Sequence, residues 1–124
     1  MNATLAVGLG GFVGSIARYR LGGLVLQHSL GSRFPAATLT VNLAGCLLVG
    51  LLAGWVEHRH ALGPATRLLL ITGFCGGFTT FSAFGLETLY LMRRDSLALA
   101  ALNVALSVAG GIAGVWIGWK VAHG

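Results

Sequence analysis

Four long apolar segments, separated by short polar loops, constrain this chain more than any other feature of its sequence. They cover residues 5–26, 36–56, 67–92 and 97–121, to within a few residues. An α-helix needs about 20 predominantly apolar residues to cross the hydrocarbon core of a bilayer, and each segment has that length. We therefore predict an all-α membrane protein in which residues 1–124 form a single domain of four transmembrane helices.

Composition and charge narrow the class of protein further. Hydrophobic residues make up 56% of the chain and charged residues only 9%, which is outside the balance of a soluble domain. The formal net charge is +5, but the basic residues occur singly or in pairs instead of forming a patch, so we expect no nucleic-acid partner. The first segment has no basic region before it and carries Arg18 and Arg20 at its far end. We interpret it as a retained helix and not as a cleaved signal peptide.

Residues between the segments support the predicted boundaries. Pro35 and Pro64 stand where the second and third helices should begin, because proline is favoured at the start of a helix. Asp95 or Ser96 is the expected N-cap of the fourth helix.

Loop charges carry only a weak orientation signal. With four crossings, both termini and the second loop lie on one side of the membrane. The basic residues of that side are Arg59, Arg67 and Lys120, and those of the other side are Arg18, Arg20, Arg33, Arg93 and Arg94. Positive loops favour the cytoplasm, but three residues against five is a small bias. We predict that such a chain inserts in both orientations.

Glycines spaced four residues apart occur in every apolar segment. They are Gly10 and Gly14; Gly50 and Gly54; Gly73 and Gly77; and Gly110, Gly114 and Gly118. This spacing lets helix backbones approach closely, so it predicts a tightly packed bundle. Four short helices enclose little volume, and a pathway between helices would therefore require several chains.

The third segment contains the stretch "GFCGGFTTFSAF", residues 73–84, where a membrane helix would ordinarily continue in leucine. Consecutive glycines lower the cost of leaving helical geometry, and Thr79 and Thr80 offer hydroxyls to the backbone groups that a break would free. We predict a broken helix beside protein or a water-filled cavity. Its carbonyls could coordinate a small cation, and the N-terminus of its second half could favour an anion.

Polar residues at membrane depth form two stripes. Asn42 follows Thr38 by one helical turn in the second segment, and Ser107 follows Asn103 in the fourth. Such side chains face protein or water and not lipid, so each stripe either bonds another helix or lines a pathway. Arg18, the deepest cation, either snorkels to the headgroups or lines the mouth of an anion path.

Other reactive residues indicate no enzyme. Cys46 and Cys75 lie in apolar segments, where buried free thiols are expected. We interpret His58 and His60 as solvated loop residues, since no ligand set for a metal is complete. No nucleophile, base and orienting group converge.

Three stretches together resemble a known family. "GGFVGSIARY", "TVNLAGCLLVG" and "GFCGGFTTFSAFGLE" are similar to motifs of the Fluc, or CrcB, fluoride channels, and the third is highly specific. The resemblance implies an antiparallel, dual-topology homodimer of four-helix subunits in the bacterial cytoplasmic (inner) membrane. It also implies two pathways for passive fluoride export and a structural sodium ion at the dimer centre.

The resemblance assigns roles to four side chains. The pore phenylalanines of the family match Phe81 and Phe84, its pore asparagine matches Asn42, and its vestibule arginine matches Arg18.

It further implies a cation site and a track of hydroxyls. The main-chain carbonyls of Gly76 and Thr79 would hold the sodium ion. Ser82 continues the hydroxyl track, but Ala83 removes one hydroxyl that the family usually has. Ser107 is a further candidate for the fluoride pathway.

Two other functions stay open at this point. A small dual-topology multidrug exporter would need a membrane-embedded carboxylate, normally in its first helix, and the first segment has none. A structural subunit could use the glycine faces to hold a larger complex, but that role leaves the helix break and Asn42 unexplained.

Overall fold

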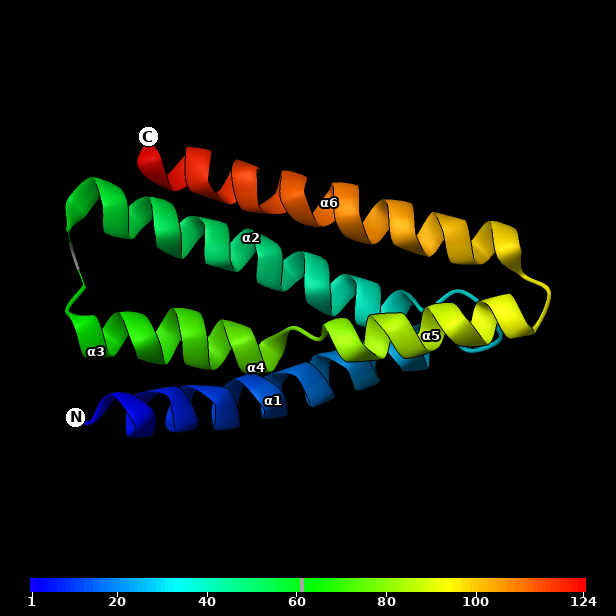
Figure 1. Ribbon diagram of the computed structural model, residues 1–124, viewed down its shortest axis with the longest axis horizontal. Coiled ribbons are helices and arrows are strands. Elements are labelled where there is room, and N and C mark those ends of the chain that lie inside the picture. Colours follow the sequence, from blue (N-terminus) through cyan, green and yellow to red (C-terminus); the bar gives the residue numbers. More distant parts are fainter. Residues whose placement is uncertain (61) are drawn as a thin grey trace.

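Apolar segments joined by short loops fold into long helices that lie side by side (Figure 1). The computed structural model describes residues 1–60 and 62–124, and in that part of the chain it contains helices and no strand. The elements are α1 (Ala3–His28), α2 (Ala36–Arg59), α3 (Pro64–Arg67), the π-helix η1 (Leu68–Cys75), α4 (Gly76–Phe78), α5 (Phe81–Arg93) and α6 (Leu97–His123). The prediction of an all-α fold is therefore confirmed for the described residues.

Three helical stretches are long and apolar enough to cross a membrane, judged by length and composition. They are Ala36–Arg59, Pro64–Arg93 and Leu97–His123. Helix α1 is not among them, because its glycines and Arg18 and Arg20 lower its hydropathy. Its 26 residues nevertheless rise about 39 Å, which is enough to span the hydrocarbon core. The chain is a multi-pass membrane protein, and a crossing by α1 stays a prediction.

Helix boundaries agree with the residues that predicted them. Pro35 directly precedes α2, and Pro64 is the first residue of α3. Ser96 is the N-cap of α6 as one of the two expected residues, but its side chain makes no capping hydrogen bond. Its hydroxyl instead donates to the carbonyl oxygen of Arg94, at 3.4 Å.

Glycines bring the helix backbones into contact. A Cβ at Gly10 or Gly14 of α1 would overlap the carbonyl oxygens of Leu69 and Phe74, respectively. On the other side of the bundle, a Cβ at Gly50 of α2 would overlap the backbone of α6. The predicted tight packing is confirmed at these positions, and it follows from the absence of a side chain at each crossing.

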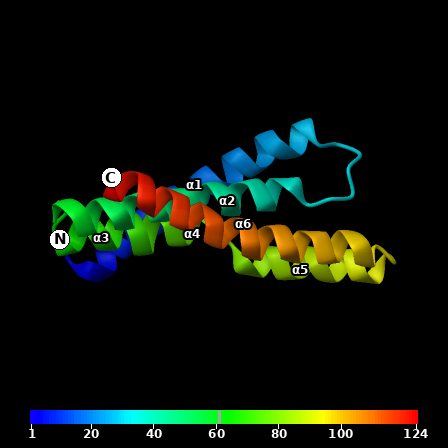
Figure 2. The ribbon, with the colours of Figure 1, turned by 90° about the horizontal axis from the view of Figure 1, so that it is seen from above.

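The bundle divides at the end opposite both termini. Figure 1 places the two termini and the facing ends of α2 and α3 at one end of the molecule. Figure 2 shows that, toward the other end, α5 and α6 run as one pair while α1 and α2 diverge from them as another. The helix break between α4 and α5 lies where this division begins.

Candidate functional site

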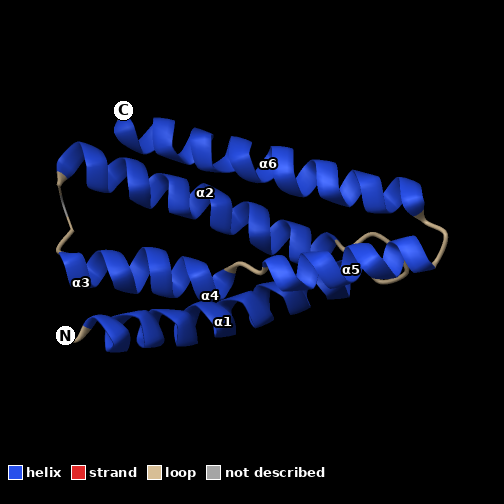
Figure 3. Cartoon of the chain, viewed as in Figure 1, coloured by secondary structure: helices blue, strands red, loops and turns tan. Residues whose placement is uncertain are grey.

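The break in the third helical stretch consists of Thr79 and Thr80, which separate α4 from α5 (Figure 3). Both residues are extended, with φ −94° and ψ 158° at Thr79 and φ −148° and ψ 112° at Thr80. The predicted break is confirmed, and the two glycines that were expected to lower its cost, Gly76 and Gly77, are themselves helical. Gly77 serves packing instead: a Cβ there would lie 2.5 Å from the carbonyl oxygen of Gly11. The β-branched threonines suit an extended backbone.

Threonine hydroxyls satisfy groups at the break, as the sequence predicts. The Thr79 hydroxyl donates to the carbonyl oxygen of Cys75 at 2.9 Å. The Thr80 hydroxyl oxygen accepts from the backbone N–H of Ala83 at 3.2 Å and so caps the start of α5. It also lies 3.2 Å from the hydroxyl oxygen of Ser82, an exposed residue in the first turn of α5.

Asn42 of α2 pairs with the break through both ends of its amide. Its Oδ1 accepts from the N–H of Thr80 at 2.7 Å, and its Nδ2 donates to the carbonyl oxygen of Thr80 at 2.9 Å. These two bonds replace helical bonds that the extended backbone of Thr80 cannot make. An amide nitrogen carries two hydrogens, so the pairing leaves one N–H of Asn42 for another acceptor.

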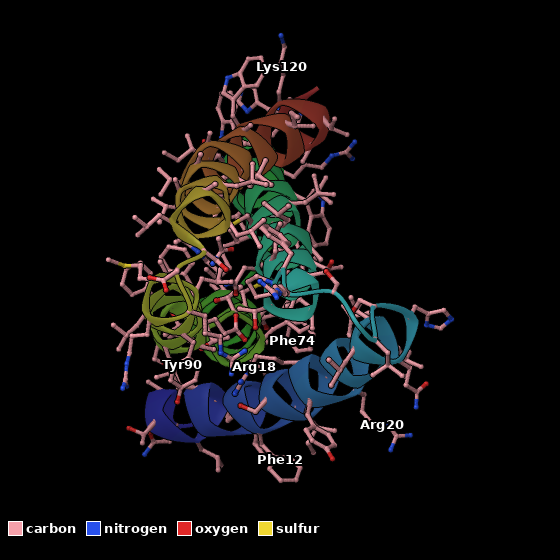
Figure 4. All side chains as sticks on the ribbon, turned by 90° about the vertical axis from the view of Figure 1, so that its right-hand side faces the viewer. Phe12, Arg18, Arg20, Phe74, Tyr90 and Lys120 are labelled. Atoms are coloured by element: carbon pink, nitrogen blue, oxygen red, sulfur yellow. The ribbon has the colours of Figure 1, made fainter. Side chains whose placement is uncertain are left out.

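Arg18 of α1 reaches the break from the other side. Its Nε donates to the carbonyl oxygen of Gly77 at 3.0 Å, and the hydroxyl of Ser15 donates to the same oxygen at 3.5 Å. Figure 4 shows Arg18 turned toward the helices, whereas Arg20 points away from the bundle. Arg18 is thus bonded to the break through Nε, and its role at the mouth of an anion path stays a prediction. Ser15 was missed, although it lies three residues before Arg18 on the same face of a helix.

The carbonyl oxygens around the break differ in whether they accept a hydrogen bond. The oxygens of Gly77 and Thr80 are bonded to α1 and α2, while those of Gly76 and Thr79 accept no hydrogen bond from residues 1–60 or 62–124. Gly76 is exposed, and a Cβ there would meet no atom within 4 Å. Free carbonyl oxygens suit a small hard cation. The two oxygens fit part of the expected sodium shell, and the rest would have to come from outside this chain.

An open groove of about 560 Å³ runs along α2, α5 and α6 beside the break. The rings of Phe81 and Phe84 lie on it with centroids 5.4 Å apart and planes inclined at 50°. Phe81 is 82% exposed in the single chain. The groove brings together six of the predicted site residues, which are Asn42, Gly76, Thr79, Phe81, Phe84 and Ser107.

Arg18 belongs to a second hollow, of about 840 Å³, between α1 and α2. Thr38, Thr80 and Ala83 also line it, and Thr80 borders the groove as well. Sequence reasoning expected a hydroxyl to be lost at Ala83, and two threonines line the same hollow as this residue. Thr80, at the break, borders both hollows.

Polar contacts join the other walls of the site. A carboxylate oxygen of Glu87 in α5 accepts from the Thr38 hydroxyl of α2 at 2.7 Å. In the polar stripe of the fourth segment, Asn103 donates to the Thr88 hydroxyl oxygen of α5 at 3.0 Å, so interhelical bonding is confirmed there. Thr88 was not identified from the sequence.

Comparisons with known proteins identify the family of this chain. The family described as "CrcB-like protein, Camphor Resistance (CrcB)" matches residues 5–119. A protein of Methylobacillus flagellatus named "Fluoride-specific ion channel FluC" is 48% identical over 121 residues, covering 98% of this chain and 94% of that protein. Proteins of the same name from Flavobacterium psychrophilum and Methylobacterium nodulans are 42% identical over 122 residues and 49% identical over 115 residues, respectively. They cover 98% and 93% of this chain, and 98% and 91% of their own lengths. This identity over nearly the whole length shows that the chain belongs to the CrcB-like protein family.

Proposed function

We propose that this chain forms a fluoride-selective channel through which fluoride leaves the bacterial cytoplasm by passive diffusion across the inner membrane. The names of its relatives support the substrate. The observation that carries the proposal is the convergence of Asn42, Phe81 and Phe84 on one groove beside a helix break.

The groove has the chemistry that a small, strongly hydrated anion needs. Fluoride must exchange its water for other donors, and Asn42 retains one N–H for this purpose. The edges of the Phe81 and Phe84 rings carry positive partial charge, and Ser107 adds a hydroxyl to the groove lining. Ser82, whose hydroxyl oxygen lies 3.2 Å from that of Thr80, would extend the path beyond the groove. These groups are neutral, so they bind an anion without trapping it. Arg18 concentrates anions in the hollow that leads to the break.

An antiparallel pair of chains would complete the site. One chain leaves the groove open and Phe81 82% exposed, so a second chain seated on this groove would enclose the pathway. The balanced loop charges favour insertion in both orientations, so a second copy can present the same groove upside down. In this arrangement α1 is the fourth crossing of each subunit.

A sodium ion at the centre of the pair would be held by the carbonyl oxygens of Gly76 and Thr79 from both chains. The freedom of these carbonyls from hydrogen bonds supports this assignment. A fixed positive charge there would offset the cost of dehydrating fluoride in the neighbouring pathways.

Fluoride efflux from liposomes that contain the purified protein tests the proposal, with chloride efflux measured in parallel. We expect rapid fluoride release and little chloride release. Equal release of both ions, or of neither, would reject a fluoride channel. Uptake of an organic cation driven by a proton gradient would instead support the multidrug exporter.

A further inference from the structure

Asn103 is the one polar side chain among the described residues that is buried, with 2% of its surface exposed. It lies in α6 behind the groove, and the groove lining does not include it. A buried amide is costly unless its hydrogen bonds are made, so the partners of Asn103 indicate what it does.

The first partner, Thr88, connects Asn103 to the backbone of Phe84 through hydrogen bonds. The Nδ2 of Asn103 donates to the Thr88 hydroxyl oxygen at 3.0 Å, and the Thr88 hydroxyl donates to the carbonyl oxygen of Phe84 at 2.7 Å. A threonine that bonds the carbonyl one turn earlier bends its helix slightly. The direction of the turn that carries the Phe84 ring is therefore linked to α6.

The other partner is Ser107, whose hydroxyl donates to Oδ1 of Asn103 at 3.5 Å. The orientation of the amide follows from hydrogen counting. Thr88 gives its single hydroxyl hydrogen to Phe84, so it can only accept from Asn103. The amide oxygen must then face Ser107. At 3.5 Å this second bond is long, so the shorter bonds to Thr88 and Phe84 carry most of the link between α5 and α6.

We propose that Asn103 is a positioning residue of the anion pathway, which ties the Phe84 turn of α5 to the Ser107 turn of α6 through one buried amide. This inference rests on the proposed function, because its main measurement is fluoride flux. Phe84 and Ser107 line the groove from different helices, and a shared amide keeps the spacing between ring edge and hydroxyl constant. Without it, α5 and α6 can shift relative to each other while both residues remain present.

A double-mutant cycle between Asn103 and Thr88 tests this link. Asn103→Leu and Thr88→Val remove the amide and the hydroxyl with little change in volume, and Thr88→Ser keeps the hydroxyl. Thr40→Val, at an exposed position of α2, is the matched control. Initial fluoride efflux is measured per folded dimer, and unfolding of each variant is followed in detergent.

We expect Asn103→Leu and Thr88→Val each to lower fluoride efflux about tenfold, which corresponds to about 1.4 kcal/mol. The double variant should lose no more fluoride efflux than either single variant, because each substitution alone already breaks the same series of hydrogen bonds. Thr88→Ser should keep most of the wild-type flux, and Thr40→Val all of it. Wild-type flux in folded Asn103→Leu protein, or multiplication of the two losses in the double variant, would overturn the inference.

The two proposals fail in different ways. If the wild-type protein releases no fluoride, the proposed function fails, and the same cycle is then evaluated by stability. Coupled losses of stability would preserve the structural link between Asn103 and Thr88, whereas independent losses would remove it.

Discussion

Replacing Asn42 by leucine should both destabilise the protein and abolish most fluoride flux. Asn42→Leu keeps the approximate size of the side chain but removes both bonds to Thr80, made at 2.7 and 2.9 Å. The N–H and C=O of Thr80 then lose their partners at membrane depth, where water does not replace them. The break would lose its connection to α2.

Two reference values bound the loss of stability. Interhelical hydrogen bonds in membranes contribute about 0.6 kcal/mol on average, so two bonds set a lower limit of about 1 kcal/mol. A buried group left unpaired costs about 1–3 kcal/mol. Because two backbone groups are affected and the extended segment cannot turn both toward new partners, we expect the free energy of unfolding to fall by about 2–4 kcal/mol.

Unfolding in mixed micelles measures this value, with the fluorescence of Trp55, Trp116 and Trp119 as the signal. Thr40→Val, on an exposed face of the same helix, is the control and should change stability by less than about 0.5 kcal/mol. A loss below about 1 kcal/mol for Asn42→Leu would refute the reasoning that Asn42 supports the break. Full stability with loss of flux would mean that Asn42 serves the anion alone.

Four further predictions concern the pathway, packing, cation and assembly. Phe84→Ile removes the ring edge and should lower fluoride efflux at least about tenfold with little change in thermal stability. The control Phe12→Ile, on an exposed face of α1, should leave efflux unchanged. Phe84→Met should retain more flux than Phe84→Ile. Gly10→Ala should cost about 1–3 kcal/mol of stability by overpacking against the η1 backbone, while Gly8→Ala, with open space around it, should not. Replacing sodium by a large organic cation should lower the melting temperature and the dimer fraction, and equal values in both buffers would argue against a bound sodium ion. In a cysteine-free background, His60→Cys should react with an impermeant thiol reagent from both sides of the membrane, and one-sided labelling would contradict dual topology.

The amino-acid sequence by itself determined the class of fold and the family. Apolar segments of about 20 residues have one stable form in lipid, so helix number and approximate ends follow from local composition. Prolines at 35 and 64 mark the beginnings of α2 and α3 because their effect on the backbone is also local. The motif around Phe81 and Phe84 was enough to indicate a fluoride channel family. Dimer, dual topology and sodium stay predictions.

The tertiary structure decided how the break is built. Sequence reasoning placed it within residues 73–84, since consecutive glycines lower the cost of leaving a helix. Gly77 packs closely on α1 and the glycine pair is helical, whereas the break lies at Thr79 and Thr80, where Asn42 supplies hydrogen bonds. Local preference was outweighed by contacts with other helices.

Side-chain direction was likewise beyond the sequence. Arg18 can reach lipid headgroups or protein from the same position, and the carbonyl oxygen of Gly77 on a neighbouring helix, which accepts from its Nε, favours the inward direction. Nothing in the sequence around Thr88 distinguishes it from other threonines, and its role follows only from its hydrogen bond with Asn103, 15 residues later. Hydrogen bonds between helices depend on distances across the bundle, and these are set by how the backbones pack and not by the residues of either helix alone.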